Sequence, residues 1–366
     1  MDIFSSAEFR DPEIAGRLVR EIRKINARGI SLMEVCGTHT MAIFRTGIRS
    51  LLPDSIRLVS GPGCPVCVTS QREIDTFVAL AGMKDVIITT FGDLIRVPGS
   101  RSSLQKERAE GRDIRVVYSI VDAIDIARKN PDKKVIFLGV GFETTAPTIA
   151  AGLIMAKEMK LDNFYAACAH KRVPPALKAL LKSPSMNIDG FLLPGHVSVI
   201  IGEEAYRSMV ETHRIPCVIT GFEPTDILQG ILALVIQINS GQARLENAYS
   251  RAVLPQGNPR AMKMLYQVFE SEDAEWRGIG VIQNSGLRIR NEYREFDALR
   301  YFDVFVDEST EPKGCSCGQV LTGTITPLQC PLFRSVCTPE EPVGPCMVST
   351  EGTCAAYYRF STDQGR

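Results

Sequence analysis

The sequence predicts an α/β protein with two similar lobes, each built on a parallel sheet, followed by a cysteine-rich, loop-rich C-terminal domain. Short apolar runs alternate with amphipathic helical stretches over about the first 245 residues, which is typical of parallel strands covered by helices on both faces. The pattern G-F-E-x-T occurs at 141–145 and again at 221–225, so one strand–helix unit recurs. Six of the eleven cysteines lie after residue 314, among prolines and glycines.

The elements begin with a predicted helix over residues 11–28, where apolar residues recur at helical spacing among charges. Residues 227–238 predict a buried helix and 258–270 one more helix, whereas 276–305 show no clear period. Eight apolar runs that end in turn-forming residues predict the strands. These runs are 30–35, 56–59, 86–90, 114–118, 135–138, 164–167, 190–193 and 217–220.

Four regions are expected along the chain. Residues 1–28 form an N-terminal helix that packs on the C-terminal domain. Residues 29–120 form the first α/β lobe and residues 121–245 the second, which contains the loops GFETTAP and PGHVS. The strand–helix alternation weakens after about residue 245, so residues 246–366 form the cysteine-rich domain.

Charge and hydropathy exclude several classes of protein. Lys+Arg and Asp+Glu both number 42, so the net charge is zero, and a nucleic-acid binder would normally be basic. The N-terminus lacks a basic region followed by an apolar run, and the most apolar segment is too short to span a membrane. We therefore expect a cytoplasmic protein. Thiols stay reduced there, so eleven cysteines indicate metal or redox chemistry rather than structural disulfides.

Five unusual loops follow predicted strands. Ligands of open parallel sheets bind outside the carboxyl ends of the strands, so the coincidence of these loops predicts a site there. The loops are Cys36–Thr40 and Gly61–Cys67 in the first lobe, and Gly141–Pro147, Pro194–Ser198 and Gly221–Pro224 in the second.

Cys36 ends a predicted strand and precedes a helix. A helix N-terminus favours thiolate, so we expect a lowered pKa for this thiol. His39 follows three residues later, where it would assist the thiol or bind a ligand. The alternative is a buried core cysteine, a common situation.

Cys64 and Cys67 form a C-x-x-C pair directly after Gly-Pro-Gly. This spacing suits a reversible disulfide or half of a metal site. Pro65 between the two cysteines favours the redox pair, and the first 300 residues hold no second C-x-x-C to complete a zinc set. Two incidental loop cysteines are the remaining alternative.

Glu143 opens a predicted helix, where capping explains it as well as a functional role does. His196 follows Pro194-Gly195 at a strand end, a setting for a ligand or an acid–base group. The chain lacks the glycine-rich phosphate-binding patterns at its strand ends, and nothing in it supports hydrolase chemistry.

The tail supplies more thiols than the four that hold a [4Fe–4S] cluster. Zinc knuckles are the alternative, but from Cys317 onward the cysteines lie 13, 7, 9 and 8 residues apart, without the paired short C-x₂₋₄-C spacing that zinc favours. An iron–sulfur cluster is therefore the stronger prediction. The six tail cysteines are Cys315, Cys317, Cys330, Cys337, Cys346 and Cys354.

Several long motifs, in order, closely resemble the HypD family of [NiFe]-hydrogenase maturation factors. They are CGTHT at 36–40, GPGCPVC at 61–67, GFETTAP at 141–147, LPGHVS at 193–198 and the tail segments CPLF, CTP, GPCMVS and EGTC between 330 and 354. The resemblance runs from about residue 30 to the C-terminus and covers the motif cysteines without departure.

The resemblance implies a scaffold on which the Fe(CN)₂CO group of the hydrogenase is built, with iron held by Cys36 and supported by His196. It implies a small HypC-like partner, through which the chain would interact with the hydrogenase large subunit. It also implies that HypE, with HypF upstream, supplies cyanide. Cys64 and Cys67 would be the redox pair. The cluster would be held by Cys315, Cys330, Cys337 and Cys354, leaving Cys317 and Cys346 as a second dithiol.

Two other functions remain open at this point. The first is a stand-alone thiol–disulfide oxidoreductase that depends on the cluster and in which Cys36 is dispensable. The second is a zinc-stabilised α/β binding protein, which the spacing of the tail cysteines disfavours.

Overall fold

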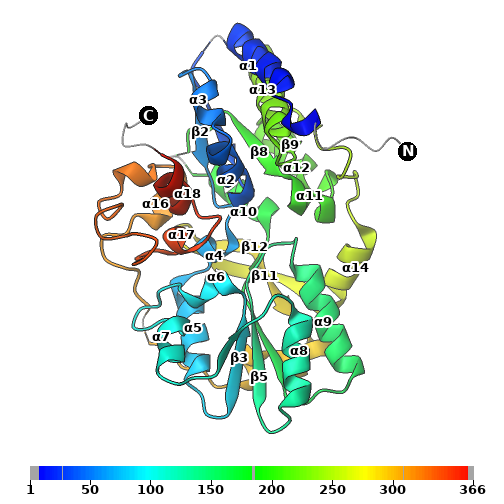
Figure 1. Ribbon diagram of the computed structural model, residues 1–366. Helices are drawn as coiled ribbons and strands as arrows, with labels where there is room; N and C mark the ends of the chain where they lie inside the picture. The colour runs from blue at the N-terminus through cyan, green and yellow to red at the C-terminus, as the bar shows by residue number, and fades with distance from the viewer. Residues whose placement is uncertain (1–7, 27, 184–185, 308, 362–366) are drawn as a thin grey trace.

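The computed structural model describes residues 8–26, 28–183, 186–307 and 309–361 (Figure 1). Two parallel sheets lie one above the other, with an antiparallel ribbon between them and the cysteine-rich tail along one side. The α/β class with parallel sheets and the cysteine-rich C-terminal region are as predicted. Within the described residues, no helix combines the length and apolar character needed to cross a membrane.

The upper part of Figure 1 is the five-stranded lobe, with strand order β10-β9-β8-β1-β2, all parallel. Its helices cover both faces, which explains why the central strands β8 and β9 are buried along their whole length. Its strands are β1 (Ile30–Glu34), β2 (Ile56–Ser60), β8 (Gly190–Pro194), β9 (Cys217–Thr220) and β10 (Leu245–Asn247). Its helices are α2 (Gly37–Arg45), α3 (Ile48–Leu51), α11 (Gly195–Ile201), α12 (Glu204–His213) and α13 (Pro224–Ser240).

The lower part is the four-stranded lobe, with parallel order β4-β3-β5-β6. Its core is formed by the apolar strands and by the buried faces of their helices. Its strands are β3 (Val86–Thr90), β4 (Ile114–Val116), β5 (Lys134–Gly139) and β6 (Phe164–Cys168). Its helices are α5 (Gln71–Ala81), α6 (Gly92–Ile95), α7 (Leu104–Ala109), α8 (Ile120–Lys129) and α9 (Ala146–Glu158).

The predicted division of the chain at residue 120 is wrong as a description of the sheets. The five-stranded lobe takes strands from 30–60 and from 190–247, and the whole four-stranded lobe lies between these segments in the sequence. Because β1 pairs with β8 on one side and with β2 on the other, it is an interior strand of the sheet and its apolar side chains are buried. An apolar run predicts a strand but not its neighbour, because partner choice depends on the packing of the helices between.

The N-terminal helix packs differently from the prediction. The 3₁₀ turn η1 (Glu8–Arg10) and α1 (Pro12–Ile25) lie against α13 of the five-stranded lobe and not on the C-terminal domain. The apolar side of α1, with Val19 and Ile22, completes the core against Ile231 and Leu234. The helix predicted from the amphipathic pattern is therefore confirmed, and the prediction that it packs on the C-terminal domain is wrong.

An antiparallel ribbon connects the lobes where the sequence shows no clear period. It consists of β7 (His170–Lys171), β11 (Phe269–Trp276) and β12 (Gly280–Ile289). A bulge between Glu272 and Ala274 shifts the register, and such a shift interrupts the two-residue alternation that reveals a strand. The adjoining helices are α10 (Val173–Leu181), α14 (Pro259–Val268), η2 (Asn291–Phe296) and α15 (Ala298–Tyr301).

The cysteine-rich tail is loop-rich, as predicted, with short helices. It contains α16 (Cys317–Leu321), η3 (Pro327–Gln329), α17 (Pro345–Val348) and α18 (Thr353–Phe360). Helix α18 packs on α2, and α17 packs on α4 (Pro65–Val68), the short helix of the C-x-x-C loop. The tail therefore lies against the strand-end loops, although more than 270 residues separate them along the chain.

Candidate functional site

Cys36 follows β1, occupies the N-cap of α2 and is only 2% exposed. Its Sγ lies 3.4 Å from His196 Nε2 at the start of α11. The backbone of Gly63 passes so close that a Cβ there would lie 2.2 Å from the Cys36 nitrogen. The carboxyl ends of β1, β2 and β8 thus bring the motifs CGTHT, GPGCPVC and PGHVS together.

Burial raises the pKa of the Cys36 thiol to about 12, and the charge of Glu351 adds to the effect. The backbone N–H groups at the start of α2 act in the opposite direction but do not prevail. The lowered pKa predicted from the helix N-terminus is therefore wrong, because desolvation of a buried thiolate outweighs the helix dipole. The thiol keeps its proton unless a metal or a base takes it.

Phe222 of the second G-F-E-x-T loop lies between the two histidines of the site. Its ring centroid is 4.7 Å from that of His39 and 4.8 Å from that of His196. His39 Nε2 lies 2.8 Å from the carbonyl oxygen of Gly221, and donates to it. Burial lowers the pKa of His39 to about 4, so its ring is neutral. In this structure His39 therefore holds the loop in place.

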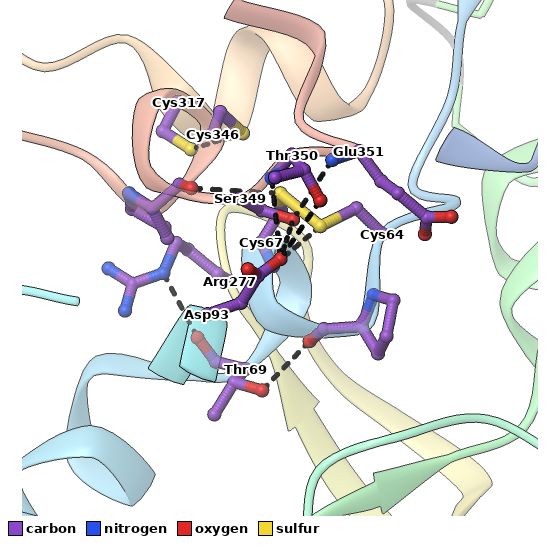
Figure 2. Close-up of a disulfide and its surroundings, with 12 residues drawn as sticks. Cys64, Cys67, Thr69, Asp93, Arg277, Cys317, Cys346, Ser349, Thr350 and Glu351 are labelled. Carbon is purple, nitrogen blue, oxygen red and sulfur yellow. Dashed lines mark hydrogen bonds between the residues drawn. A yellow bond between two sulfur atoms is a disulfide. The ribbon is translucent and has the colours of Figure 1, made fainter. Parts of the chain in front are cut away.

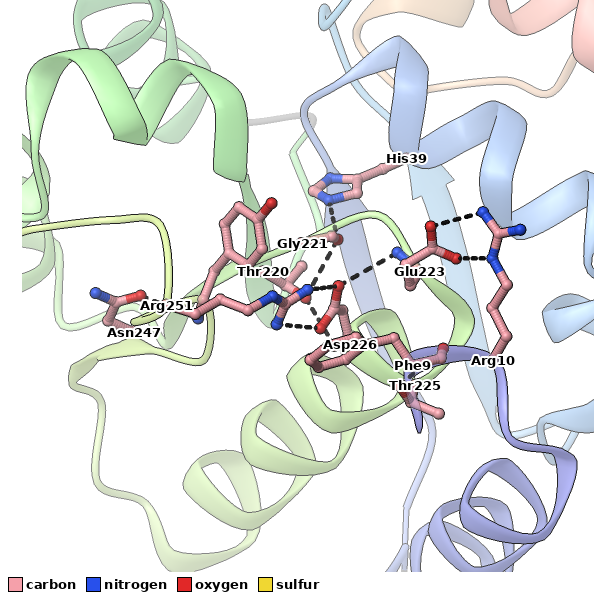
Figure 3. A network of polar contacts seen from close by, with 11 residues as sticks. Phe9, Arg10, His39, Thr220, Gly221, Glu223, Thr225, Asp226, Asn247 and Arg251 are labelled. Atoms are coloured by element: carbon pink, nitrogen blue, oxygen red, sulfur yellow. Dashed lines mark hydrogen bonds and ion pairs between the residues drawn. The ribbon is translucent and has the colours of Figure 1, made fainter. Parts of the chain in front are cut away.

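The same loop is anchored from below by charges that the sequence analysis missed (Figure 3). Asp226 is fully buried and accepts two hydrogen bonds, of 2.8 and 2.6 Å, from Arg251. The Arg251 guanidinium stacks over Phe9, and Glu223 pairs with Arg10. The only signal in the sequence was an aspartate in the first turn of a predicted helix, which usually reads as a cap.

Cys64 and Cys67 form a disulfide (Figure 2). Their loop meets the Cys36 loop, because the Gly37 N–H donates to the Gly63 carbonyl oxygen at 3.0 Å. The pair flanks the first turn of α4, and the Cys67 sulfur lies 3.9 Å from the carbonyl oxygen of Pro345 in the tail. Both sulfurs belong to one buried cluster with Cys317 and Cys346. The C-x-x-C pair therefore contacts the tail at Pro345, and its loop contacts the Cys36 loop at Gly63.

A turn of the tail touches both lobes. Asp93 of α6 accepts hydrogen bonds from the Ser349 hydroxyl at 3.2 Å and from the Thr350 N–H at 3.3 Å. On the other side, the Thr38 hydroxyl donates to Glu351 at 2.6 Å. Figure 2 shows this turn directly above the disulfide. Asp93 and Glu351 were not predicted, because neither lies in a strand-end loop motif.

The six tail cysteines gather in one place. Cys317 and Cys346 have their sulfurs 2.9 Å apart and both are buried. Hydrogen bonds from Cys315 and Cys346 hold the pKa of Cys317 well below its usual value, and the Arg277 charge adds to them. Cys330, Cys337 and Cys354 interact electrostatically with one another or with this group. In the described part of the chain, no three His, Cys, Asp or Glu side chains converge on a single metal ion.

Glu143 follows β5 of the four-stranded lobe and caps a helix other than the predicted one. Both of its oxygens accept the Val173 N–H, at 3.0 and 3.1 Å, at the start of α10. The side chain is 3% exposed, and burial raises the pKa of its carboxyl to about 7. It lines a cavity of about 710 Å³ together with Arg172 and Lys178.

Comparison with known proteins identifies the family. The model of the HypD family, described as the hydrogenase formation hypA family, matches residues 13–361. The chain belongs to the HypD family. It is 46% identical over 331 residues to the putative hydrogenase expression/formation protein MJ0993 of Methanocaldococcus jannaschii, covering 90% of this chain and 92% of that protein. It is 44% identical to the hydrogenase maturation factors HypD of Rhodobacter capsulatus and Escherichia coli, covering 97% and 96% of this chain and 97% of each relative.

As a HypD-family protein, the chain acts in hydrogenase maturation, which implies a role in assembling the hydrogenase metal centre. The donor set of its tail, six thiols, is of the kind that holds an iron–sulfur cluster. Four thiolates that hold a cluster bind separate irons, so they surround it without meeting at a point. A Cβ on Gly344 would lie 2.8 Å from the Cys315 sulfur, and the Val343 N–H donates to Cys337 at 3.3 Å. Glycine and a backbone donor beside these sulfurs suit such a cradle.

The raised pKa of Glu143 makes stability depend on pH. The pKa of Glu143 is about 7 in the folded chain and lower in the unfolded chain, so between these two pKa values the folded chain binds more protons. The free energy of unfolding therefore falls as pH rises from the unfolded-state pKa to the folded-state pKa. Glu143→Gln removes the titration, so from pH 5 to pH 8 the variant should gain about 2–3 kcal/mol relative to the parent. Urea unfolding at both pH values measures this.

The matched control is Glu223→Gln. The pKa of Glu223 is lowered by its contact with Arg10, so its titration falls below this range. Equal pH dependence in the parent and in Glu143→Gln would show that Glu143 does not titrate as its burial implies.

Proposed function

We propose that this HypD-family chain is a scaffold that holds iron at Cys36 while the Fe(CN)₂CO group is assembled. The observation that supports this most is the contact of the Cys36 sulfur with His196, 3.4 Å away, on a loop that meets the loop of the Cys64–Cys67 disulfide. A buried thiol with an imidazole at its side and a redox pair on the adjoining loop suits binding and reduction of a soft metal. Low-spin iron(II) that carries cyanide and CO prefers thiolate.

His196 supplies the base for iron binding. A thiol must lose its proton to ligate a metal, and the Cys36 pKa of about 12 makes spontaneous loss unfavourable. Burial lowers the pKa of His196, so its ring is neutral. Iron that binds the sulfur would lower the pKa of the thiol, and the Nε2 atom, 3.4 Å away, would then accept the proton. His196 is only partly buried, so it can pass the proton to water.

The disulfide and the tail provide the redox support. Cys315, Cys330, Cys337 and Cys354 would hold a [4Fe–4S] cluster, which supplies single electrons. Cys317 and Cys346, whose sulfurs lie 2.9 Å apart, would be a second dithiol in the same buried cluster as Cys64 and Cys67. Reduction of that disulfide would take two electrons, passed one at a time from the cluster, and two protons from solvent, and would break the S–S bond to leave two thiols.

The proposed partners follow from the family. A small HypC-like protein would share the iron with Cys36 and carry the finished group to the hydrogenase large subunit. HypE, with HypF upstream, would supply cyanide. We propose that these steps take place in the cytoplasm, and that neither nucleic acid nor a membrane takes part.

The alternative function is a stand-alone thiol–disulfide oxidoreductase that depends on the cluster. The Cys64–Cys67 disulfide, in contact with the tail, is the observation that favours it. In that case Cys64 and Cys67 are essential, and Cys36 is dispensable.

The scaffold is tested on the anaerobic complex of the full chain with a HypC-like partner. We expect about four iron and four sulfide per chain for the cluster, plus one labile iron, and infrared bands of bound cyanide and CO. A complex with a full cluster but without these bands would contradict the scaffold role. A colourless protein with stoichiometric zinc would contradict the cluster.

A further inference from the structure

The cavity of about 710 Å³ that Glu143 lines lies where the five-stranded lobe meets the antiparallel ribbon. Helix α10 contributes one face to it, because Pro174, Lys178 and Lys182 are spaced four residues apart and lie on the same side of the helix. The other walls come from α11, α12, α14 and β12. Sites for small molecules commonly enclose about 300–1,000 Å³, so the cavity has room for a ligand.

Three cations line the cavity without a carboxylate partner. They are Arg172, Lys178 and Lys182. In the part of the chain that the structure describes, none of the three forms an ion pair. The Lys178 Nζ donates to the Ser208 hydroxyl at 3.0 Å, and the Arg172 Nη1 donates to a hydroxyl and to a backbone carbonyl, all of which are neutral acceptors. The positive charge of the cavity is therefore not offset by these contacts.

The one carboxylate in the lining is already engaged. Both oxygens of Glu143 accept the Val173 N–H, and no ion pair joins Glu143 to Arg172. The dipole of α10 favours cations at the end of the helix, where Lys178 and Lys182 lie, although two like charges four residues apart repel each other. The dipole does not favour Arg172, which occupies the N-cap at the positive end of the helix. An anion in the cavity would relieve the repulsion at both ends of α10.

Most of the remaining lining is apolar. Met262 and Tyr266 lie four residues apart on α14, and Val281 belongs to β12. Tyr266 is 40% exposed and Val281 is 71% exposed. Binding sites combine apolar walls with a few polar groups that fix the ligand, so these side chains suit the apolar body of an organic molecule.

The donors favour a carboxylate over a phosphate. Proteins commonly bind phosphate with free backbone N–H groups at the start of a helix. The start of α10 offers none, because the Val173 N–H is bonded to Glu143 and the next two residues, Pro174 and Pro175, have no N–H. The groups that remain are side-chain cations, and the fork of an arginine matches a carboxylate.

We propose that this cavity binds a small organic acid, with carboxylates against Arg172, Lys178 and Lys182 and an apolar body against Tyr266 and Val281. The 9 residues of α10 span about 14 Å, so a molecule with a carboxylate at each end reaches the cations at both ends of the helix. Neither Cys36 nor His196 lines the cavity, so ligand binding here does not depend on the proposed iron site.

The test is isothermal titration calorimetry of the full chain, purified anaerobically, with four probes. Terephthalate carries a carboxylate at each end of an aromatic ring and should bind once per chain. Benzoate, with one carboxylate, should bind more weakly, and benzamide, which is neutral, should give no heat of binding. Phenyl phosphate distinguishes the two kinds of anion, and tighter binding of phenyl phosphate than of benzoate would overturn the assignment to a carboxylate.

Lys178→Gln and Lys182→Gln should each weaken terephthalate binding about tenfold, because each removes a hydrogen bond between charged groups. Both lysines lie at the surface of α10, so the variants should unfold in urea as the parent does. The matched control is Lys263→Gln on α14, which removes an exposed lysine that does not line the cavity and should leave the affinity unchanged.

Two results would overturn the proposal. One is no heat of binding with terephthalate at millimolar concentration, and the other is equal affinity in the parent, Lys178→Gln and Lys182→Gln. Either result would leave the proposed iron scaffold untouched, because the infrared bands of cyanide and CO report on that site separately.

Discussion

Cys36→Ala should abolish hydrogenase maturation while the chain stays folded and keeps its cluster. Cys36 follows β1 at its carboxyl end, and its sulfur lies 3.4 Å from His196 Nε2. Alanine fits the space but cannot bind iron. The iron outside the cluster, and with it the infrared bands of cyanide and CO, should be absent from the complex. Hydrogenase activity in cells that carry only this variant should be undetectable.

Cys168→Ala is the matched control, because Cys168 lies at the end of β6 in the other lobe, outside the sulfur group described above. It should keep the cyanide and CO bands and support maturation. The comparison also separates the two candidate functions. If Cys36→Ala supported full maturation while Cys64→Ser did not, the chain would be an oxidoreductase and not an iron scaffold.

Gly63→Ala should be nearly as damaging, although it removes no functional group. A Cβ there would lie 2.2 Å from the Cys36 nitrogen and 2.3 Å from its Cα, both backbone atoms that cannot rotate away. The loop that carries Cys36 must shift, and a displacement of about 1 Å in a site commonly costs about a hundredfold in activity. Overpacking of this kind also destabilises a fold by about 1–3 kcal/mol. Maturation assays and urea unfolding measure the two effects.

Gly29→Ala is the control for the glycine change itself. A Cβ on Gly29 meets no atom within 4 Å and its backbone is not left-handed, so stability and maturation should be preserved. Normal maturation by Gly63→Ala would show that the close contact between the two loops is not needed to present Cys36.

The fold was predictable where local pattern decides it. Continuous apolar runs predicted every strand of the two parallel sheets except the short edge strand β10. The ribbon β11–β12 was not predicted. Its bulge at Glu272 interrupts the alternation of apolar and polar residues, and its strands expose polar side chains. The assignment of strands to lobes failed as well, since β1 pairs with β8 from a segment that lies far along the chain.

The candidate site was predictable in its residue types and not in its roles. Glycine-rich loops after strands pointed to Cys36, Cys64 and Cys67, and the loops that carry them do meet, at Gly63. His39 and Glu143 lie in the same kind of loop, yet the structure uses them to bond Gly221 and to cap α10. A loop motif after a strand predicts that a side chain lies at the carboxyl end of the sheet. The group that this side chain contacts depends on which other loop packs against it, and the motif does not encode that.

The sequence by itself determined the α/β class, the family and the set of thiols, because strand pattern and motif spacing are local properties of the chain. Only the tertiary structure decided that Cys36 is a buried, protonated thiol and that the tail lies against its loop. Burial and the charge of Glu351 set the pKa of Cys36. That pKa therefore depends on a residue hundreds of positions away along the chain, which no local pattern encodes.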